Sequence, residues 1–395
     1  TLRTDLRDHL ADYLRLNRGI VRSPEDILVT AGVRDGLQLA LRVLGLARGA
    51  QSTTLFPTPA APPVPHSAQE ARARFLARVD RWMEEEPPLA AWFLSGLQGS
   101  DIEERRERLA SRCPELIAHG LSDLTTPHAW SLRERLQEVA PVQVLGSLKN
   151  LAAESPEAWA IRERWETRQP EAVAASLDGL DSERAWALRE RLEAQVPETV
   201  LTSLGRLGSA RAWQWRERWL RARGGTAALS QEKVARLACK SIRSLDDEHA
   251  WEWRQRAWET APDAVLRTLT GLDCERAWSL REQHVVRAAK LVLESLEGLD
   301  SPRAWALRES FGVQCEEALE SFEGMEGATA WRLRQSLAST WPAAAVKSLG
   351  ALCQEPRGEE LITRLLSEHP RDFALLRQAA RMAPDARDAR REASA

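Results

Sequence analysis

The chain has 395 residues, of which 43% are hydrophobic and 29% are charged, and its formal net charge is only −3. This length and apolar content suffice for a sizeable buried core. The near balance of charge argues against a protein that binds nucleic acid or anionic membrane through a general excess of basic residues. No apolar run approaches the roughly 18 residues that a membrane helix needs, and neither the cysteines nor the histidines follow a metal-ligand spacing.

The first 46 residues do not share the pattern of the rest of the chain. They predict an amphipathic helix, a short strand at residues 27–30 and a second helix from about Val33. Residues 10–40, with Pro-Glu-Asp-Ile-Leu-Val-Thr-Ala-Gly at 24–32, resemble the early part of the aminotransferase-like domain of fold-type I PLP enzymes, especially MocR-type transcriptional regulators. In that family the residues after the strand help to hold the cofactor phosphate, which implies Gly32, Val33 and Arg34 here.

Beyond this segment the sequence lacks the other parts of a PLP site. There is no lysine in an α/β context for a Schiff base, no aromatic residue to stack on the pyridine ring and no aspartate for its nitrogen. We therefore predict an aminotransferase-like fragment at residues 1–46 and no bound cofactor. Residues 47–67 contain five prolines and predict a flexible linker.

From residue 68 the sequence repeats with a period of about 27 residues. An Ala-Trp pair marks eight units, with its tryptophan at Trp130, Trp159, Trp186, Trp213, Trp251, Trp278, Trp305 and Trp331. A second marker, two apolar residues three apart, keeps the same phase from Leu94/Leu97 to Leu349/Leu352. A Ser or Thr such as Ser203 precedes this marker in most units, and we interpret it as a small residue that lets helices approach closely. Two markers in phase indicate a tandem array.

One unit shows how the pattern predicts structure. Asp181 or Ser182 precedes a helix whose Ala185 and Leu188 share one face, and Pro197 suits the first turn of a second helix. Because helices of about ten residues are marginal alone, each pair must cover its apolar face with the next pair. We therefore predict an all-α fold, an α-solenoid of about eleven short two-helix repeats over residues 68–384. Divergent caps end the solenoid, and a charged tail occupies residues 385–395.

The repeats resemble HEAT-like arrays of short helices in architecture. Their Ala-Trp-x-Leu-Arg-Glu-Arg motif, as at residues 185–191, is also similar to repeat tails of bacterial thymidylate-kinase-like proteins. The sequence contains no phosphate-binding loop of the kind that such kinases use. This resemblance therefore implies no kinase activity.

The middle of the array departs from the common unit. The step from Trp213 to Trp251 is 38 rather than 27 residues, and a longer second helix starting near Ser230 would absorb most of the 11 extra residues. The insertion is either neutral or a protrusion that meets a partner. Additional tryptophans lie around it and would form a hot-spot surface if exposed. The candidate binding residues here are Trp215, Trp219, Trp253, Trp258 and Lys233.

An arginine stands three residues after the tryptophan in every marked unit, and this spacing places it beside its own indole. In one interpretation these arginines form an internal ladder, stacked on the indoles and bonded to carbonyls or to carboxylates such as Asp181, Asp273 and Asp300. In the other they are a row of anion sites for nucleic acid or an acidic peptide. The candidate binding residues of that row are Arg189, Arg216 and Arg254.

No Ser–His–Asp order, paired-carboxylate motif or phosphate loop can be singled out in the sequence. The Arg- and Ala-rich composition is typical of high-GC bacteria, and the scattered cysteines and the lack of a signal peptide favour the cytoplasm. We therefore predict a non-enzymatic, cytoplasmic bacterial scaffold that binds an unidentified protein partner on its curved surface. One alternative is a nucleic-acid-binding HEAT-like array that uses the arginine ladder. The other is an accessory domain of a PLP- or nucleotide-dependent protein.

Overall fold

The computed structural model describes residues 67–149, 151, 155–223, 230–370 and 372–383. The chain divides into two compact units, residues 1–63 and 64–395, and all described residues belong to the second. The fragment predicted at residues 1–46, the predicted linker apart from Ser67 and the tail predicted at 385–395 lie outside the described residues. The stretch from residue 67 to residue 383 is termed the array.

The array is an α-solenoid of helix pairs, as the repeat predicts, and its described residues contain no strand. The first helices of the pairs are α3 (Ala68–Glu85), α5 (Ser100–Leu109), α7 (Pro127–Leu136), α9 (Pro156–Trp165), α11 (Glu183–Leu192), α13 (Ala210–Arg223), α15 (Glu248–Trp258), α18 (Pro302–Phe311), α20 (Ala328–Leu337) and α22 (Pro356–Glu368). The second helices are α4 (Pro87–Phe93), α6 (Pro114–His119), α8 (Pro141–Gly146), α10 (Pro170–Ala175), α12 (Pro197–Thr202), α14 (Gln231–Ser241), α16 (Pro262–Leu266), α19 (Glu317–Glu320), α21 (Pro342–Lys347) and α23 (Phe373–Met382). One pair is continuous as α17 (Glu275–Glu294), and a 3₁₀ turn, η2 (Gly350–Gln354), follows α21. No helix in this part of the chain combines the length and hydrophobicity that a membrane crossing needs.

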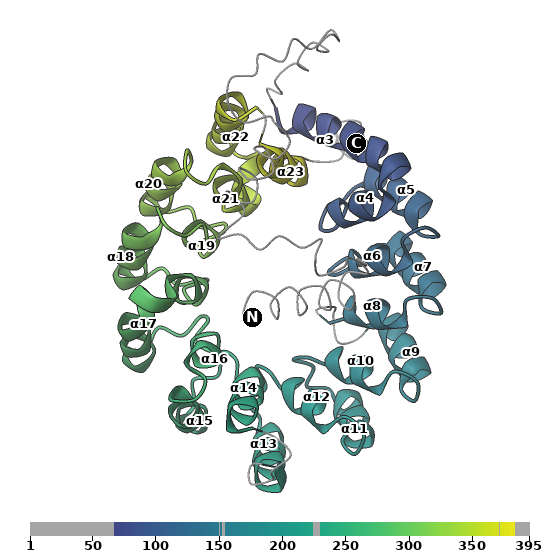
Figure 1. The fold of residues 1–395 in the computed structure, drawn as a ribbon, viewed down its shortest axis with the longest axis vertical. Coiled ribbons are helices and arrows are strands. Elements are labelled where there is room, and N and C mark those ends of the chain that lie inside the picture. Colours follow the sequence, from purple (N-terminus) through teal and green to yellow (C-terminus); the bar gives the residue numbers. More distant parts are fainter. Residues whose placement is uncertain (1–66, 150, 152–154, 224–229, 371, 384–395) are drawn as a thin grey trace, which may run out of the picture. The chain divides into compact units, whose positions relative to one another are not determined.

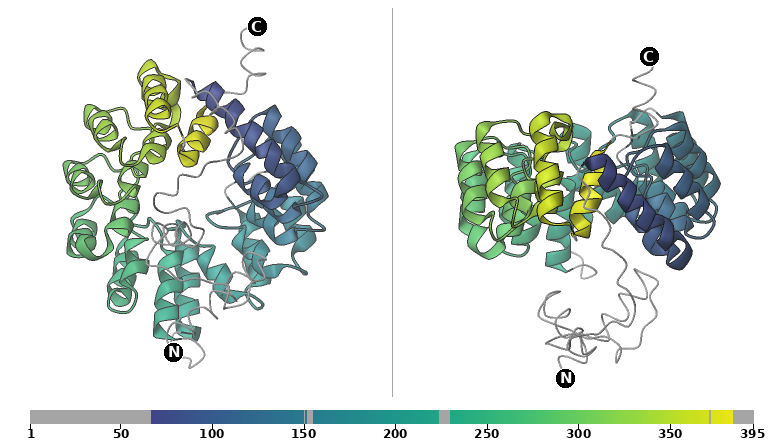
Figure 2. Two further views of the ribbon diagram at one scale, coloured as in Figure 1. Left: turned by 45° about the horizontal axis from the view of Figure 1, so that its top comes forward. Right: turned by 90° about the horizontal axis from the view of Figure 1, so that it is seen from above.

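The second helices form a continuous inner row. Each packs against the second helix of the next pair, from α4 and α6 onward to α21 and α23. The first helices lie further apart, so the array curves with its second helices on the concave side (Figure 1). Figure 2 shows the helices standing side by side in a wall one pair thick. The inner row, meaning the second helices and the turns that follow them, is therefore the concave surface of the array.

Local signals explain why each pair forms. The Ser182 hydroxyl accepts a hydrogen bond from the Ala185 amide at 3.3 Å and caps α11, and Pro197 occupies the first turn of α12. Leu188 and Leu204 are buried between the helices and the neighbouring pairs. Burial of each such side chain contributes about 1.5–3 kcal/mol, which offsets the low intrinsic stability of helices this short.

A tight turn with one residue in the left-handed region follows most of the second helices. Glycine occupies this position at Gly96, Gly179, Gly271, Gly298 and Gly324, where φ lies between 74° and 78°. Glycine adopts this conformation without the steric penalty of a Cβ atom. Three described turns instead place Asp123, Arg206 and Ser244 there, with φ of 64°, 67° and 59°. Each of these residues costs roughly 1–2 kcal/mol relative to its ordinary backbone conformation.

The long unit confirms one expectation and adds a feature. The predicted longer second helix is present: α14 has 11 residues, and the Ser230 hydroxyl caps it by accepting from the Lys233 amide at 3.2 Å. The first helix, α13, is also extended to 14 residues, against 10 in α11. Residues 224–229, which join the two helices, lie outside the described residues.

Helix α17 contains a pair whose two helices are merged across a kink. Ala288 in its middle has φ −139° and ψ 44°. The residue before the second helix has a similar backbone in seven other pairs, with φ between −129° and −147°, and proline follows it each time. Ala289 therefore occupies the place where the other pairs have proline.

Substitution of Ala289 by proline is expected to raise the free energy of unfolding by about 0.4–1 kcal/mol, because the backbone already has the required shape and proline restricts the unfolded chain. Ala288→Pro, one residue earlier, is the matched control and is expected to destabilise, because φ there is far from −65°. Thermal melting of both variants measures the difference. A loss of stability in Ala289→Pro would contradict the equivalence of α17 with the other pairs.

The first and last pairs of the array pack against each other. Helix α3 contacts α23, and the Phe75 and Phe373 rings stack with centroids 5.5 Å apart. The Arg72 guanidinium donates to the Ala380 and Ala383 carbonyls at 3.2 Å, and that of Arg377 donates to the Ser95 carbonyl. The two divergent ends, interpreted from sequence as caps of a solenoid, thus cover one another and close the array (Figure 1).

Candidate functional site on the inner row

A ladder of buried arginines runs through the array. Its nine members are at most 2% exposed: Arg106, Arg133, Arg162, Arg189, Arg216, Arg254, Arg281, Arg308 and Arg334. In a typical rung, the Arg189 guanidinium lies 4.8 Å from the Trp186 ring centroid and donates to the carbonyls of Leu177, Leu180 and Ser203 at 2.7–3.1 Å. The stacking on indoles and the carbonyl bonds that the spacing predicts are both present.

Eight of the nine rungs join two successive second helices, whereas Arg106 bonds only the Leu94 and Leu97 carbonyls after α4. Leu177 and Leu180 lie in the turn after α10, and Ser203 follows α12, so the Arg189 guanidinium bonds carbonyls beyond the ends of both helices. Helix C-termini leave carbonyls without intrahelical partners and carry partial negative charge, which favours a cation there. Burial lowers the pKa of Arg189 to about 10, so the group remains charged at neutral pH. The ladder therefore links neighbouring repeats.

The carboxylates near the ladder bond the tryptophans and not the arginines. Asp181, Asp273 and Asp300 each accept a hydrogen bond from the indole N–H of the tryptophan five residues later, at 2.7 Å. The sequence analysis offered these carboxylates as hydrogen-bond partners of the ladder arginines, and that prediction was wrong. The reason is geometric: the turn carbonyls already surround the guanidinium, and the indole edge faces the aspartate.

The recurring Ser or Thr has a second role that the sequence pattern did not reveal. The Ser203 hydroxyl accepts from Nε of Arg189 at 3.0 Å and donates to the Val200 carbonyl at 2.8 Å. Thr268 and Ser295 do the same for Arg254 and Arg281. The spacing between the arginine and the hydroxyl, which is 14 residues in these three units and 13 between Arg308 and Ser321, was the available signal.

The candidate binding residues chosen from sequence do not gather on one open surface. Arg189, Arg216 and Arg254 are ladder members with at most 1% exposure. Trp215, Trp219 and Trp253 are buried and Trp258 is partly buried, with Trp215 packed on Trp186 and Trp258 on His284. Lys233 is exposed and pairs with Glu198 at 2.9 Å. Binding through any of them stays a prediction.

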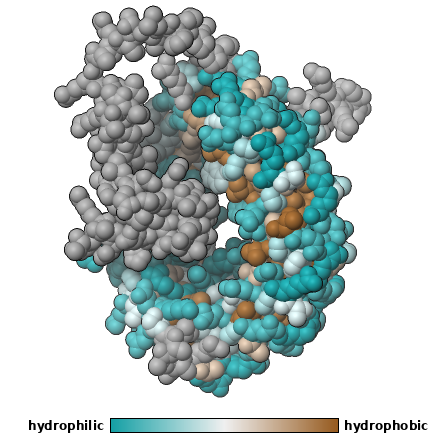
Figure 3. Space-filling model, turned by 45° about the vertical axis from the view of Figure 1, so that its right-hand side comes forward, coloured by the Kyte–Doolittle hydropathy of each residue, from teal (hydrophilic) through white to brown (hydrophobic). Residues whose placement is uncertain are grey.

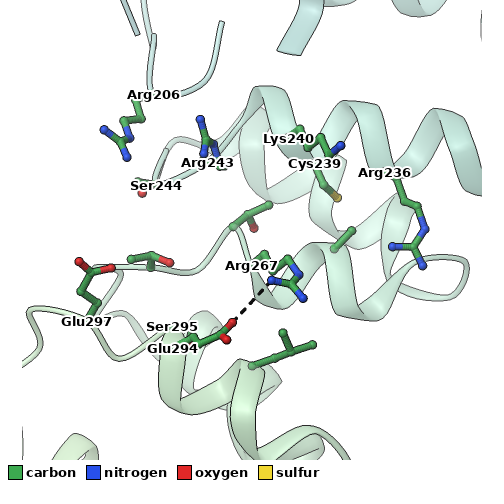
Figure 4. Close-up of a pocket in the computed structure, with 14 residues that line it drawn as sticks. Arg206, Arg236, Cys239, Lys240, Arg243, Ser244, Arg267, Glu294, Ser295 and Glu297 are labelled. Atoms are coloured by element: carbon green, nitrogen blue, oxygen red, sulfur yellow. Dashed lines mark ion pairs between the residues drawn. The ribbon is translucent and has the colours of Figure 1, made fainter. Parts of the chain in front are cut away.

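A basic groove of about 560 Å³ lies on the inner row. Its cations come from three successive pairs, as Figure 4 shows: Arg206 in the turn after α12, Arg236, Lys240 and Arg243 on and after α14, and Arg267 after α16. Glu294 and Glu297, from α17 and its turn, border the groove on one side. The basic groove is defined by these five cationic side chains, none of which the sequence pattern singled out.

The cations of the basic groove are only partly neutralised. Arg243 pairs with Asp178 at 2.6 Å, Arg236 pairs with Asp263 at 2.7 Å and Glu232, and Arg267 pairs with Glu294 at 3.6 Å. Arg206 and Lys240 are exposed and have no ion-pair partner among the described residues. Nε of Arg243 is buried without a hydrogen-bond acceptor in the described part of the chain. The exposed guanidinium of Arg206 and the exposed ammonium of Lys240 are therefore the donors available for an anionic group.

The thiol of Cys239 also lines the basic groove. Burial raises its pKa to about 12, so it stays protonated at neutral pH. A protonated thiol is a poor nucleophile and a poor metal ligand. The groove is thus suited to binding anions through its cations and not to thiolate chemistry.

An acidic cluster follows the basic groove along the inner row. It comprises Glu294, Glu297, Glu317, Glu320 and Glu323, which line a second hollow of about 200 Å³ with Lys347. Lys290 bonds Glu317 and Lys347 bonds Glu320, whereas Glu297 and Glu323 are exposed and have no ion pair in the described residues. The charge of the inner row therefore changes sign between α16 and α19.

Comparison with known proteins gives one short match. No family model matches the chain, and no solved structure matches it. A stretch of 39 residues is 54% identical to the HTH-type pyridoxine biosynthesis transcriptional regulator PdxR of Corynebacterium glutamicum. The match covers 10% of this chain and 9% of that regulator. It is a regulator of the MocR type, the class that residues 1–46 resemble, and so short a match assigns no family to the chain as a whole.

Proposed function

We propose that the array is a non-enzymatic scaffold that binds a protein partner on its inner row. The supporting observation is that the recurring residues and the inner-row residues have different roles. The side chains that recur in most units, such as Arg189, Trp186 and Ser203, are buried and hold the repeats together. The inner-row side chains differ from unit to unit, from the cations at α14 to the acids at α19. Variable residues on a rigid concave frame are typical of helical-repeat binding surfaces.

The chemistry of the surface favours recognition by charge. Exposed large hydrophobic residues in the described array are scattered: Trp92, Val139, Val142, Val286 and Val313. The face in Figure 3 is largely hydrophilic, with hydrophobic residues in small separate patches. Single exposed hydrophobic residues are ordinary on soluble surfaces and do not mark a docking site. A partner would therefore be held mainly by polar and charged contacts.

The two alternatives predicted from sequence gain less support. Phosphate contacts by the arginine ladder need exposed guanidinium groups, but the ladder is buried and its donors face backbone carbonyls. An accessory role in a PLP- or nucleotide-dependent protein rests on residues 1–46, which lie outside the described residues. We therefore retain the scaffold as the proposed function.

Affinity capture from host-cell extract, followed by mass spectrometry, tests this proposal. The chain with Arg206→Glu and Lys240→Glu is compared with the unaltered chain and with a control in which Arg276→Glu and Arg332→Glu reverse exposed charges on first helices. A partner protein is expected on the unaltered and control chains and not on the inner-row variant. The purified pair should then bind in calorimetry. The proposal would be contradicted if the inner-row variant captured the same partner protein, or if nuclease treatment abolished its capture.

A further inference from the structure

We propose that the basic groove binds a short acidic segment of the partner protein, and that the acidic cluster beside it rejects longer polyanions. This inference rests on the proposed function and names the chemistry that the partner must present. The first argument is availability. Arg206 and Lys240 are exposed and lack an ion-pair partner among the described residues. Carboxylates are natural acceptors for such donors and form charge-assisted hydrogen bonds with them.

The second argument is the backbone at Arg206. Its φ of 67° lies in the region that five other turns of the array fill with glycine. A side chain at this position costs stability, roughly 1–2 kcal/mol, where glycine would cost little. Strained backbone of this kind clusters at functional sites, and of the three described turns that place a residue other than glycine here, this one carries a cation. At this turn, the strain places a guanidinium at the edge of the basic groove (Figure 4).

The third argument separates a peptide from nucleic acid. A nucleic acid carries uniform negative charge along its length and would need a uniformly basic path. Along the inner row, the basic groove ends at Glu294 and Glu297, and Glu323 lies beyond them. These carboxylates repel a polyanion that extends past the groove. A polypeptide can confine its acidic residues to the basic part.

The spacing of the cations limits the length of the acidic segment. They come from three successive pairs, so the groove spans two steps between neighbouring second helices. Packed helices lie about 8–10 Å apart, and an extended peptide advances about 3.3 Å per residue. The basic groove therefore spans about 16–20 Å and accommodates an acidic stretch of about five to seven residues.

Fluorescence anisotropy with the full chain and a labelled octapeptide of Asp and Glu tests the inference. Arg206→Gly is the informative variant, because it removes the cation and relieves the backbone. It should weaken binding about fivefold to tenfold, since one charge-assisted contact is lost, while melting stays equal or rises. Asp123→Gly is the matched control: it relieves the same strain at φ 64° in another turn and should leave binding unchanged. Unaltered peptide affinity in Arg206→Gly would overturn the inference.

A second pair of probes tests the rejection of long polyanions. The octapeptide is expected to bind more tightly than an octameric oligothymidylate, and a 20-residue acidic peptide should gain nothing over the octapeptide. Glu297→Gln with Glu323→Gln should improve the affinity for the 20-residue peptide about threefold or more, because like-charge repulsion is removed, and leave the octapeptide unaffected. Tighter binding of the oligothymidylate would show a nucleic-acid site and refute the inference.

The two proposals fail in different ways. If a partner protein depends on Arg206 and Lys240 for capture but the acidic octapeptide does not bind, the scaffold survives and the acidic-segment inference fails. If the octapeptide binds through Arg206 but the capture of every protein is unaffected by Arg206→Glu with Lys240→Glu, the groove is an anion site and the scaffold proposal fails.

Discussion

Replacement of Arg189 by alanine is expected to lower the free energy of unfolding by about 3 kcal/mol, because three buried carbonyls lose their donor and a cavity opens between two repeats. The guanidinium supplies bonds to the carbonyls of Leu177, Leu180 and Ser203 and has no exposed surface. Arg189→Lys should recover only part of the loss, since a single ammonium group cannot reproduce the planar fork of a guanidinium. The shift of the urea midpoint measures both effects.

Arg191 provides the matched control for this prediction on the same helix. It is exposed and pairs with Glu166 at 2.6 Å, an ion pair on the surface of α11. Its replacement by alanine should cost less than about 1 kcal/mol, because exposed ion pairs contribute little. If Arg189→Ala and Arg191→Ala cost the same, the ladder does not hold the repeats together.

Substitution of Phe373 by aspartate is expected to separate the two ends of the array. The Phe373 ring lies among Phe75, Phe93 and Trp82, with centroids 5.0–5.5 Å away, and Arg78 packs over it. Loss of such an aromatic contact costs about 3 kcal/mol or more, and a carboxylate among these rings adds a desolvation penalty. Small-angle X-ray scattering should show a larger radius of gyration, and α3 and α23 should become sensitive to proteolysis.

Phe373→Leu serves as the control, because leucine keeps the site apolar and should leave the radius of gyration unchanged. A second comparison is Phe322→Ala, which empties a buried site inside the array, away from α3 and α23. It should lower stability without separating the ends. An unchanged radius of gyration in Phe373→Asp would show that the contacts of Arg72 and Arg377 suffice for closure.

A few substitutions on the inner row should change binding without changing stability. Arg206 and Lys240 project from a frame whose own cohesion depends on the buried ladder, so changes at the surface should leave the frame intact. This separation lets binding and stability be measured independently in one protein. It also explains why the informative variant, Arg206→Gly, is expected to bind less tightly without being less stable.

The sequence by itself determined the repeating unit of this protein. Ser182 at a helix start, Pro197 at the next, and Trp186 with Arg189 three residues later act within a few residues or within one pair. Caps, proline placement and helical periodicity depend on such short-range interactions, which is why helix pairs, their number and the longer α14 followed from the pattern.

The tertiary structure alone decided closure and the basic groove. Phe75 meets Phe373 because the small rotation from each pair to the next accumulates over the whole array, and no local signal encodes that sum. Arg206, Arg243 and Arg267 line one groove because the turns of three different pairs lie side by side on the concave surface. In the sequence they are ordinary arginines at three different positions of the repeat. Their common site depends on the curvature that the packed second helices impose.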